Sequence, residues 1–466
     1  MKKVLLLSPP YLPDYMRNAR CDFVSNSGTQ WFPIWLGCCG ALLEKYGFQV
    51  KLVDAPSYGF SHKRTEKIFL DYKPDLLVVY TGHKSEDNDV NFTDNLLDKY
   101  NCPAILVGPY FSINPKNTLS KSKRIKYGVD SEFEYPILEF LQGKNPREIN
   151  NFLVKENNVV KKNKNRPYLN TEELDNIPFI SEFFHHHLNF RYYRAPSEHH
   201  PFVDLMTGRG CYWGLCTYCL WVHSYIKGRI YNVRSVNSVI EEFKFIERHM
   251  PYVRSVMIQD DTFPADRARQ FSEAKLKAEV ELPWSCYARG DLDFDTLKLM
   301  KRANCRNLHV GFESADNKIL KNVKKGLTKE RMTRFAEDAK RAGLRIHGDF
   351  AIGFPGESIG SIEKTIEWAC QIRPETAQFQ LMIPFPGTPF HEELKRDNCL
   401  LNGAPTFPKV SKREMEKMAK KAHRRFYISF PYLWQVVKDP YELFFSRIKT
   451  YRRALAAIFW KKWNVR

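Results

Sequence analysis

The chain has 466 residues, of which 43% are hydrophobic and 27% charged, which excludes disorder throughout and predicts two or three domains. Residues 4–7 are too short an apolar run for a secretory signal, and no stretch reaches the roughly 20 apolar residues of a membrane-spanning helix. With 11 cysteines, most of them isolated, we expect a cytoplasmic protein whose clustered cysteines serve a metal or catalysis.

The first part of the chain alternates predicted strands and helices. Continuous apolar runs indicate buried parallel strands at residues 3–10, 49–56, 73–82 and 102–110, and residues 35–50 indicate a helix. We therefore predict a doubly wound α/β domain of the Rossmann type over residues 1–142, with a ligand crevice at the carboxyl ends of its strands. Residues 143–200 are expected to form a hairpin and a linker.

The strand and helix rhythm resumes over residues 201–395. Six further strands are predicted, at residues 201–210, 255–263, 282–290, 307–314, 345–357 and 377–388. Six units cannot complete an eight-stranded TIM barrel, but they suffice for a partial (β/α)6 barrel. Residues 396–466 are predicted to be helical, aromatic and basic.

Three cysteines lie within nine residues at the entrance to the predicted barrel: Cys211, Cys216 and Cys219. This spacing predicts a metal site. One alternative is structural zinc with His223 as a fourth ligand, and the other is an iron–sulfur cluster with three protein ligands and one open iron. Because zinc modules are small and autonomous whereas this loop opens a series of strand–helix units, we favour the cluster.

Several motifs in order resemble the radical S-adenosylmethionine (SAM) superfamily: "TGRGCYWGLCTYCLW", "VMIQDDTF", "WSCYAR", "LHVGFESADNKILKNVKKGLT", "GLRIHGDFAIGFPGES" and "PFPGTPF". The preceding α/β domain resembles the cobalamin (B12)-binding domain of the class B members. The phrases "WFPIWLG", "VDAP" and "CTYCLW" look most similar to the hopanoid-biosynthesis-associated proteins. The resemblance extends from residue 1 to about residue 395.

The resemblance implies that Cys211, Cys216 and Cys219 hold a [4Fe–4S] cluster whose open iron binds SAM. One electron, from a flavodoxin- or ferredoxin-type donor, would cleave SAM to a 5′-deoxyadenosyl radical. The sequence departs from the family at one point, because four residues separate Cys211 from Cys216 where the family usually has three. We expect Gly214 to let the loop bulge around the extra residue.

The same resemblance assigns SAM contacts along the predicted barrel. Tyr218 would pack on the base, Asp260 or Asp261 would accept from the ammonium group, and Arg289 would pair with the carboxylate. One of the two aspartates is alternatively a helix N-cap, and Arg289 alternatively forms a surface ion pair. The ribose and adenine contacts would come from Glu313, Ser314, Gly353, Pro355 and Gly356.

Cobalamin would lie at the strand ends of the first domain, near Pro10, Trp35, Asp54, His83 and Gly108. His83 is a candidate axial ligand, although a hydrogen-bonded loop histidine is the alternative. Trp35 could pack on the corrin face or belong to the core.

We therefore expect a B12-dependent radical SAM enzyme that acts on an unactivated carbon of a lipid-like or natural-product substrate, by methylation or by radical rearrangement of the hopanoid-tailoring kind. A tRNA- or protein-modifying radical enzyme and a non-catalytic metal scaffold are the alternatives. Residues 411–466 carry 15 Lys/Arg against 4 Asp/Glu, mixed with aromatic residues. This pattern suits peripheral contact with an anionic membrane, and RNA is the less favoured partner.

Overall fold

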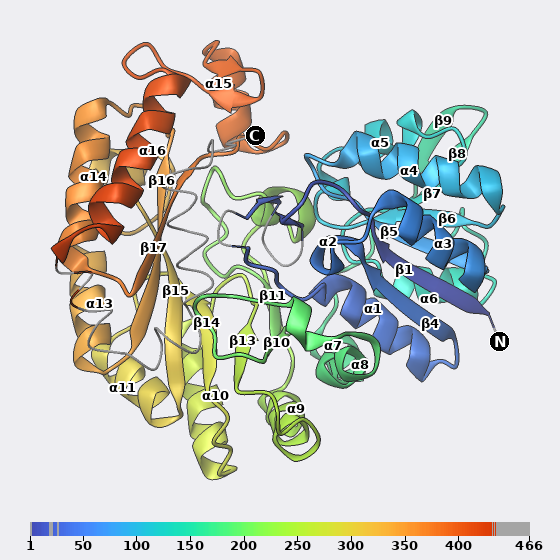
Figure 1. Ribbon diagram of the computed structural model, residues 1–466, viewed down its shortest axis with the longest axis horizontal. Coiled ribbons are helices and arrows are strands. Elements are labelled where there is room, and N and C mark those ends of the chain that lie inside the picture. Colours follow the sequence, from blue (N-terminus) through green and yellow to red (C-terminus); the bar gives the residue numbers. More distant parts are fainter. Residues whose placement is uncertain (1, 18–21, 26–27, 431, 433, 435–466) are drawn as a thin grey trace.

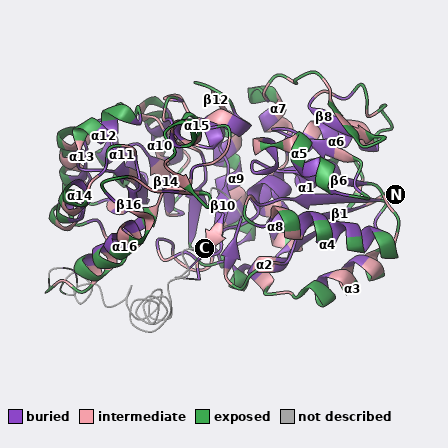
Figure 2. Cartoon of the chain, turned by 90° about the horizontal axis from the view of Figure 1, so that it is seen from above, coloured by how far each residue is buried: buried purple, intermediate pink, exposed green. Residues whose placement is uncertain are grey.

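The computed structural model describes residues 2–17, 22–25, 28–430, 432 and 434. They form two α/β lobes that lie side by side, each built on one large sheet (Figure 1). Buried residues concentrate in the strands and on the helix faces turned toward them, while the outer helix faces are exposed (Figure 2).

The first lobe contains a seven-stranded sheet in the order β4-β1-β5-β6-β7-β8-β9. Its first five strands are parallel, and β8 and β9 run antiparallel as a hairpin that extends the sheet beyond β7. The hairpin expected after residue 143 is therefore present, but it is part of the sheet rather than a linker. The strands are β1 (Lys3–Ser8), β4 (Gln49–Asp54), β5 (Leu76–Tyr80), β6 (Ala104–Val107), β7 (Tyr127–Val129), β8 (Phe152–Glu156) and β9 (Val159–Lys162).

Helices cover both faces of this sheet, as the uninterrupted apolar runs predict. One face packs against α1 and α6, and the other packs against α3, α4 and α5. The helices of this lobe are α1 (Ile34–Lys45), α2 (Ala55–Tyr58), α3 (His62–Tyr72), α4 (Glu86–Lys99), η1 (Phe111–Ile113), α5 (Pro115–Lys121) and α6 (Glu134–Leu141).

The second lobe contains six parallel strands that follow one another in chain order, which is an open, partial barrel. The strands are β10 (Phe202–Leu205), β13 (Ser255–Ile258), β14 (Trp284–Ala288), β15 (Cys305–Glu313), β16 (Arg345–Ile352) and β17 (Thr376–Leu381). The helices between them are α9 (Val236–His249), α10 (Ala265–Lys277), α11 (Phe294–Arg302), α12 (Asn317–Asn322), α13 (Lys329–Arg341) and α14 (Ile359–Ile372). The expected α/β fold with parallel sheets is confirmed.

The two lobes share one continuous apolar core. Between them the chain forms α7 (Thr171–Asn176), α8 (Ile180–His187) and η2 (Phe190–Tyr192). A buried ion triad crosses the junction, because Arg209 donates to Glu132 and to Glu134 at 2.7 Å each. Removing one member of such a triad leaves an uncompensated buried charge, so the triad fixes how the lobes meet.

Short elements complete the fold: the hairpins β2 (Tyr15–Met16) with β3 (Phe23–Val24), β11 (Gly208–Gly210) with β12 (Tyr231–Val233) and β18 (Leu400–Leu401) with β19 (Ala404–Pro405), the π-helical turn η3 (Trp221–Tyr225), and helices α15 (Pro389–Arg396) and α16 (Lys412–Tyr427).

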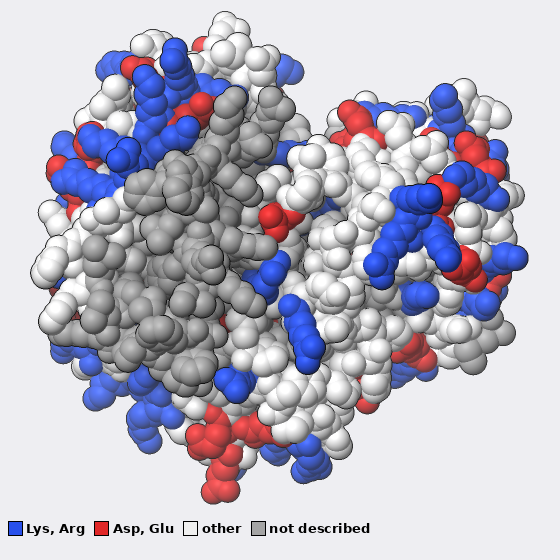
Figure 3. Space-filling model, viewed as in Figure 1, with Lys and Arg blue, Asp and Glu red and all other residues white. Residues whose placement is uncertain are grey.

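Helix α16 is the described part of the predicted basic C-terminal region. Its exposed face carries Arg413, Lys417, Lys420, Lys421, Arg424 and Arg425, and Lys and Arg gather over this part of the barrel lobe (Figure 3). Arg425 lies 3.7 Å from Glu363 of α14, so part of this face is paired. No helix in the described part of the chain is long and apolar enough to cross a membrane. The rest of the predicted membrane-contact segment, apart from residues 432 and 434, lies outside the described residues.

Candidate active site at the barrel mouth

The cysteine loop leaves β11 through glycine. Gly210 and Gly214 have positive φ angles of 85° and 62°. A Cβ atom at Gly214 would lie 2.5 Å from the carbonyl oxygen of Gly228, so no side chain fits there. Gly214 thus has the backbone conformation and the close packing that only glycine allows, which is consistent with the expected bulge; the bulge itself stays a prediction.

The three thiols are half-buried beside two cations. Burial raises the pKa of Cys216 to about 11, the nearby Lys325 and Arg289 oppose that rise, and Cys219 adds to it. No three His, Cys, Asp or Glu side chains of the described chain converge as the ligands of a single metal ion do. The thiolates that bind a [4Fe–4S] cluster need not converge in this way, because each of them binds a different iron atom.

His223, the alternative fourth zinc ligand, has its ring Nε2 3.0 Å from the carbonyl oxygen of Cys216. That nitrogen is therefore engaged with the backbone of the cysteine loop. The donor set at the loop is three thiols, which fits a cluster with one open iron better than a four-ligand zinc site.

Asp260 and Asp261 tie the cysteine loop to the barrel. Asp260 is buried and accepts from the amide (2.7 Å) and the hydroxyl (2.7 Å) of Thr207 and from the hydroxyl of Tyr231 (3.0 Å). Asp261 accepts from the amide of Gly210 at 2.8 Å, one residue before Cys211. Neither is an N-cap, because α10 begins at Ala265 with Pro264 as its cap. The N-cap alternative is therefore wrong.

Arg289 follows β14 and is buried under the cysteine loop. Its guanidinium lies 4.6 Å from the ring centroid of Trp213, and Nη2 donates to the carbonyl of Lys325 at 2.6 Å. Burial alone would lower the pKa of Arg289, but Cys216 and other nearby groups raise it on balance. Its Nε also lies 3.5 Å from Asp291 Oδ2 with both side chains largely buried, so the ion pair of the alternative is present but does not lie at the surface.

Tyr218, Glu313 and Lys325 form one hydrogen-bonded group. Glu313 Oε1 accepts from Tyr218 at 2.9 Å and from the Lys325 ammonium at 3.0 Å. Glu313 ends β15 with a φ of 61°, a backbone conformation that is uncommon for a non-glycine residue. Ser314 is fully buried, and its hydroxyl accepts from the amide of Asp316 at 3.1 Å, a local structural role.

The "GFPGE" turn is held by a residue that the sequence reasoning missed. Glu357 is buried and accepts from the amides of Gly353 at 2.6 Å and Phe354 at 3.3 Å. Gly353 and Gly356 have φ angles of 113° and 87°. A Cβ at Gly353 would meet the side chain of Pro405 at 2.9 Å, so the close approach there is to the protein itself, while Pro355 and Gly356 are more exposed.

The predicted cobalamin residues divide into two groups. Pro10, Asp54 and Gly108 lie at or just beyond the carboxyl ends of β1, β4 and β6. Trp35 instead packs on Trp221 and Tyr225, with ring centroids at 5.9 and 4.8 Å, which favours the core alternative. His83 follows β5, burial lowers its pKa, and its ring lies 5.4 Å from Phe385 of the barrel lobe.

Two hydroxyls at this edge of the first sheet are unusual. Ser8 ends β1 and Thr81 directly follows β5, and both are buried. Neither hydroxyl has a hydrogen-bond partner in the described part of the chain. Buried hydroxyls are normally satisfied, so an unpaired pair marks a place for water or a ligand. No sequence pattern singles them out, because Ser and Thr are common at strand ends.

The inner face of the barrel is polar. Phe312 and Phe350 contact Trp368 of α14, so this side of the sheet faces the helices. On the opposite side, the ring of His309 lies 5.1 Å from Tyr287 and 4.8 Å from His347. Burial lowers the pKa of His309 far below its ordinary value, and its Nε2 has no partner among the described residues.

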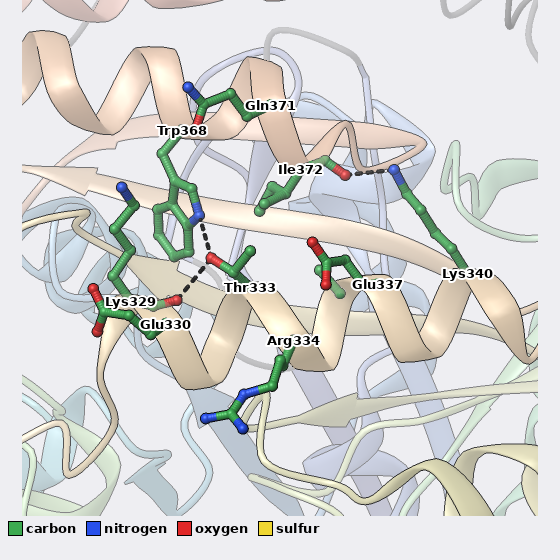
Figure 4. Close-up of a pocket in the computed structure, with 10 residues that line it drawn as sticks. Lys329, Glu330, Thr333, Arg334, Glu337, Lys340, Trp368, Gln371 and Ile372 are labelled. Atoms are coloured by element: carbon green, nitrogen blue, oxygen red, sulfur yellow. Dashed lines mark hydrogen bonds between the residues drawn. The ribbon is translucent and has the colours of Figure 1, made fainter.

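A cavity of about 680 Å³ lies outside the barrel, between α13 and α14 (Figure 4). Its wall contains Thr333, which accepts from the indole of Trp368 at 2.8 Å, and five charged side chains. None of the predicted site residues lines it.

Residues 205–369 match the sequence profile of the radical SAM superfamily. An uncharacterized methyltransferase of Pyrococcus horikoshii is 27% identical over 484 positions, covering 98% of this chain and 99% of the relative. A cytidylyl-2-hydroxyethylphosphonate methyltransferase of Streptomyces wedmorensis is 26% identical, covering 99% of this chain and 92% of the relative.

Two solved structures share the fold. The radical SAM methyltransferase TsrM of Kitasatospora setae, with cobalamin and a [4Fe–4S] cluster bound, has a TM-score of 0.66 at 17% identity and covers 87% of this chain and 80% of its own. The cobalamin-dependent enzyme OxsB, with aqua-cobalamin and SAM bound, has a TM-score of 0.70 at 15% identity, and the match covers 98% of this chain and 70% of the OxsB chain. Residues 205–369 are thus a radical SAM domain, and the predicted assignment of the chain as a radical SAM enzyme is confirmed.

Proposed function

We propose that the protein is a cobalamin-dependent radical SAM methyltransferase. The observation that carries the proposal is the cysteine loop at the mouth of the radical SAM barrel, in a chain whose relatives named methyltransferases match it over nearly its whole length. These names favour methyl transfer over the rearrangement that the sequence left open.

Cys211, Cys216 and Cys219 would hold the [4Fe–4S] cluster, and SAM would complete its open iron. The cluster supplies the electron for SAM cleavage, and cobalamin carries the methyl group. Beside the loop, Arg289 would offer a cation for the SAM carboxylate, and the Glu313 carboxylate would accept from the ribose hydroxyls. Asp260 has its oxygens engaged by protein donors, so its role is to hold the loop in place.

Three observations support a cobalamin site in the first lobe. The strand order β4-β1-β5-β6-β7 is that of flavodoxin-like sheets, whose ligands bind at the switch point between the first and third strands. Here that point lies between β1 and β5, where Ser8 and Thr81 bury unpaired hydroxyls. His83 follows β5, and the lowered pKa keeps its ring neutral, the form that binds metals.

The substrate, we propose, is a polar small molecule. The inner face of the barrel carries Tyr287, His309 and His347, and His309 leaves a buried nitrogen for a hydrogen bond. An alkyl chain would leave this nitrogen unpaired, which is unfavourable. The Streptomyces relative is also named for a polar substrate. Within the predicted choice of a lipid-like or natural-product substrate, this supports the natural product over hopanoid tailoring.

The test is anaerobic reconstitution with iron, sulfide and cobalamin, followed by SAM turnover under reduction, so that reduced cobalamin is present to accept the methyl group. We expect about four irons per chain, and both S-adenosylhomocysteine and 5′-deoxyadenosine as products. Cys216→Ala should lower the iron content and abolish SAM cleavage, whereas Cys370→Ala, a half-buried cysteine of α14, should behave as wild type. If 5′-deoxyadenosine forms with no S-adenosylhomocysteine, rearrangement replaces methyl transfer. If Cys216→Ala cleaves SAM normally, the cluster assignment is wrong.

A further inference from the structure

Arg17 is a buried cation with unused hydrogen-bonding capacity. It follows the short strand β2, its side chain has 0% exposure, and its guanidinium lies 5.1 Å from the ring centroid of Tyr15. Nη1 donates to Asp89 Oδ2 at 2.8 Å and to the carbonyl oxygen of Tyr80 at 3.4 Å. Nε and Nη2 have no partner in the part of the chain that the structure describes.

The unused donors lie on one side of the guanidinium. Nε and Nη2 form the edge with which arginine binds carboxylates and phosphates through two parallel hydrogen bonds. Asp89 does not occupy this edge, because it contacts Nη1 and also accepts from the hydroxyl of Ser85 at 2.7 Å and the amide of Gly82 at 3.1 Å. Two buried charged donors without acceptors are strongly unfavourable, so the described residues leave this edge of the guanidinium for a ligand to complete.

The position of Arg17 relates it to the proposed cofactor. Tyr80 ends β5, and the register of β1 with β5 sets Leu7 opposite Val79, so Ser8 lies beside Tyr80. Arg17, Ser8 and Thr81 therefore present unpaired buried donors at the same switch point of the sheet. A ligand that completes all three must bring acceptors to this edge, and an anionic group is the best partner for the guanidinium.

Among the described residues, the charged groups Asp89, Asp22 and Lys84 near this edge have partners of their own. The Asp89 carboxylate forms an ion pair with Arg17 itself, and the Lys84 ammonium lies close enough to the Asp22 carboxylate for the two charges to interact. Asp22 accepts from the amides of His83 and Lys84 at 2.8 and 3.2 Å, and also from the hydroxyl of Tyr15. These carboxylates already have donors, so neither is positioned to satisfy the free edge of Arg17.

We propose that the Nε–Nη2 edge of Arg17 binds the phosphodiester of the nucleotide tail of cobalamin. This inference rests on the proposed function and adds a named anchor to it. The phosphodiester is the anionic group of this cofactor, since the side chains of the corrin ring are neutral amides. Arg17 would thereby hold the nucleotide tail at the switch point of the first sheet.

The experiment compares two corrinoids that differ in this group, cobalamin and cobinamide, which lacks the phosphate, ribose and benzimidazole. Binding to the full-length protein is measured by absorbance titration. Wild type should bind cobalamin more tightly than cobinamide. Arg17→Met should weaken cobalamin binding by about 10- to 100-fold and leave cobinamide binding within about twofold of wild type. Ser120→Ala, at an exposed hydroxyl of α5, is the control and should change neither affinity.

Arg17→Lys separates a binding defect from a folding defect, because a lysine keeps the ion pair with Asp89 but lacks the Nε–Nη2 edge. It should weaken cobalamin binding selectively, by less than Arg17→Met does. Equal weakening of both corrinoids, or of neither, overturns the inference while leaving cobalamin binding intact as a function. If wild type binds neither corrinoid, the cobalamin part of the proposed function fails and the inference fails with it.

Discussion

The carboxyl edges of the two parallel sheets are built in different ways. At the barrel edge the two carboxylates around the cysteine loop are paired with protein donors: Asp260 accepts from Thr207 and Tyr231, and Glu313 accepts from Tyr218 and Lys325. At the edge of the first sheet, Ser8, Thr81 and one side of Arg17 are buried without partners among the described residues. A paired edge keeps its shape before any ligand arrives, whereas an unpaired edge is completed by the ligand. The barrel edge is therefore a preformed support for the cysteine loop.

The largest effect should come from breaking the cross-links of the barrel edge at Asp260. Asp260→Ala leaves three donors of Thr207 and Tyr231 buried without an acceptor. We expect the free energy of unfolding to fall by about 4 kcal/mol, measured by urea denaturation of the cofactor-free protein. Asp260→Asn retains one acceptor and should lose less. A loss below about 0.5 kcal/mol for Asp260→Ala would mean that the barrel edge is not held in this way.

Gly214→Ala tests whether the cysteine loop is as closely packed as the geometry indicates. The added Cβ would overlap the carbonyl oxygen of Gly228, so we expect a loss of about 3 kcal/mol and a lower iron content after reconstitution. Gly228→Ala is the matched control, because Gly228 also has a positive φ, of 92°, but open space around the added atom. It should lose only about 1 kcal/mol and retain its iron. Equal iron contents in the two variants would count against a rigid loop.

Each edge also contains a carboxyl group whose pKa burial raises to about 7: Glu357 at the barrel edge and Asp22 at the first sheet. The pKa of each of these carboxyl groups is higher in the folded protein than in the unfolded chain. The protonated group therefore contributes to the free energy of unfolding fully below pH 4, and this contribution is lost as the pH rises through about 7. The free energy of unfolding should fall between pH 5 and pH 8 in the wild type, and Glu357→Gln should make this fall smaller by up to about 3 kcal/mol. Asp22→Asn should act in the same direction.

Glu156→Gln, at an exposed glutamate, is the control for the loss of a charge. The measurement is a series of urea denaturation curves from pH 5 to pH 8. A slope that Glu357→Gln leaves unchanged would show that its carboxyl group is already ionised in the folded protein at pH 5.

The sequence predicted those parts of the site that depend on local pattern. The strand ends, the three cysteines and the glycine of the cysteine loop could be recognised from apolar runs, spacing and the need for a flexible backbone. The contacts that complete the site depend on residues far apart in the chain, such as Arg289 with the carbonyl of Lys325 and Arg17 with Asp89. The role of Trp35 was likewise not predictable, because the local sequence around an aromatic residue is the same whether its ring packs on a cofactor or on the neighbouring lobe.

The smallest expected effect comes from replacing threonine by valine. This substitution tests the difference between the two edges most directly, because it can be made at both of them. Thr207→Val removes a buried hydroxyl that donates to Asp260, and should lower the unfolding free energy by about 1–3 kcal/mol. Thr81→Val removes a buried hydroxyl without a partner among the described residues, so it should leave the cofactor-free protein unchanged or more stable by a few tenths of a kcal/mol. A loss at Thr81 equal to that at Thr207 would show that both edges are paired alike, and that the first sheet needs no ligand to complete it.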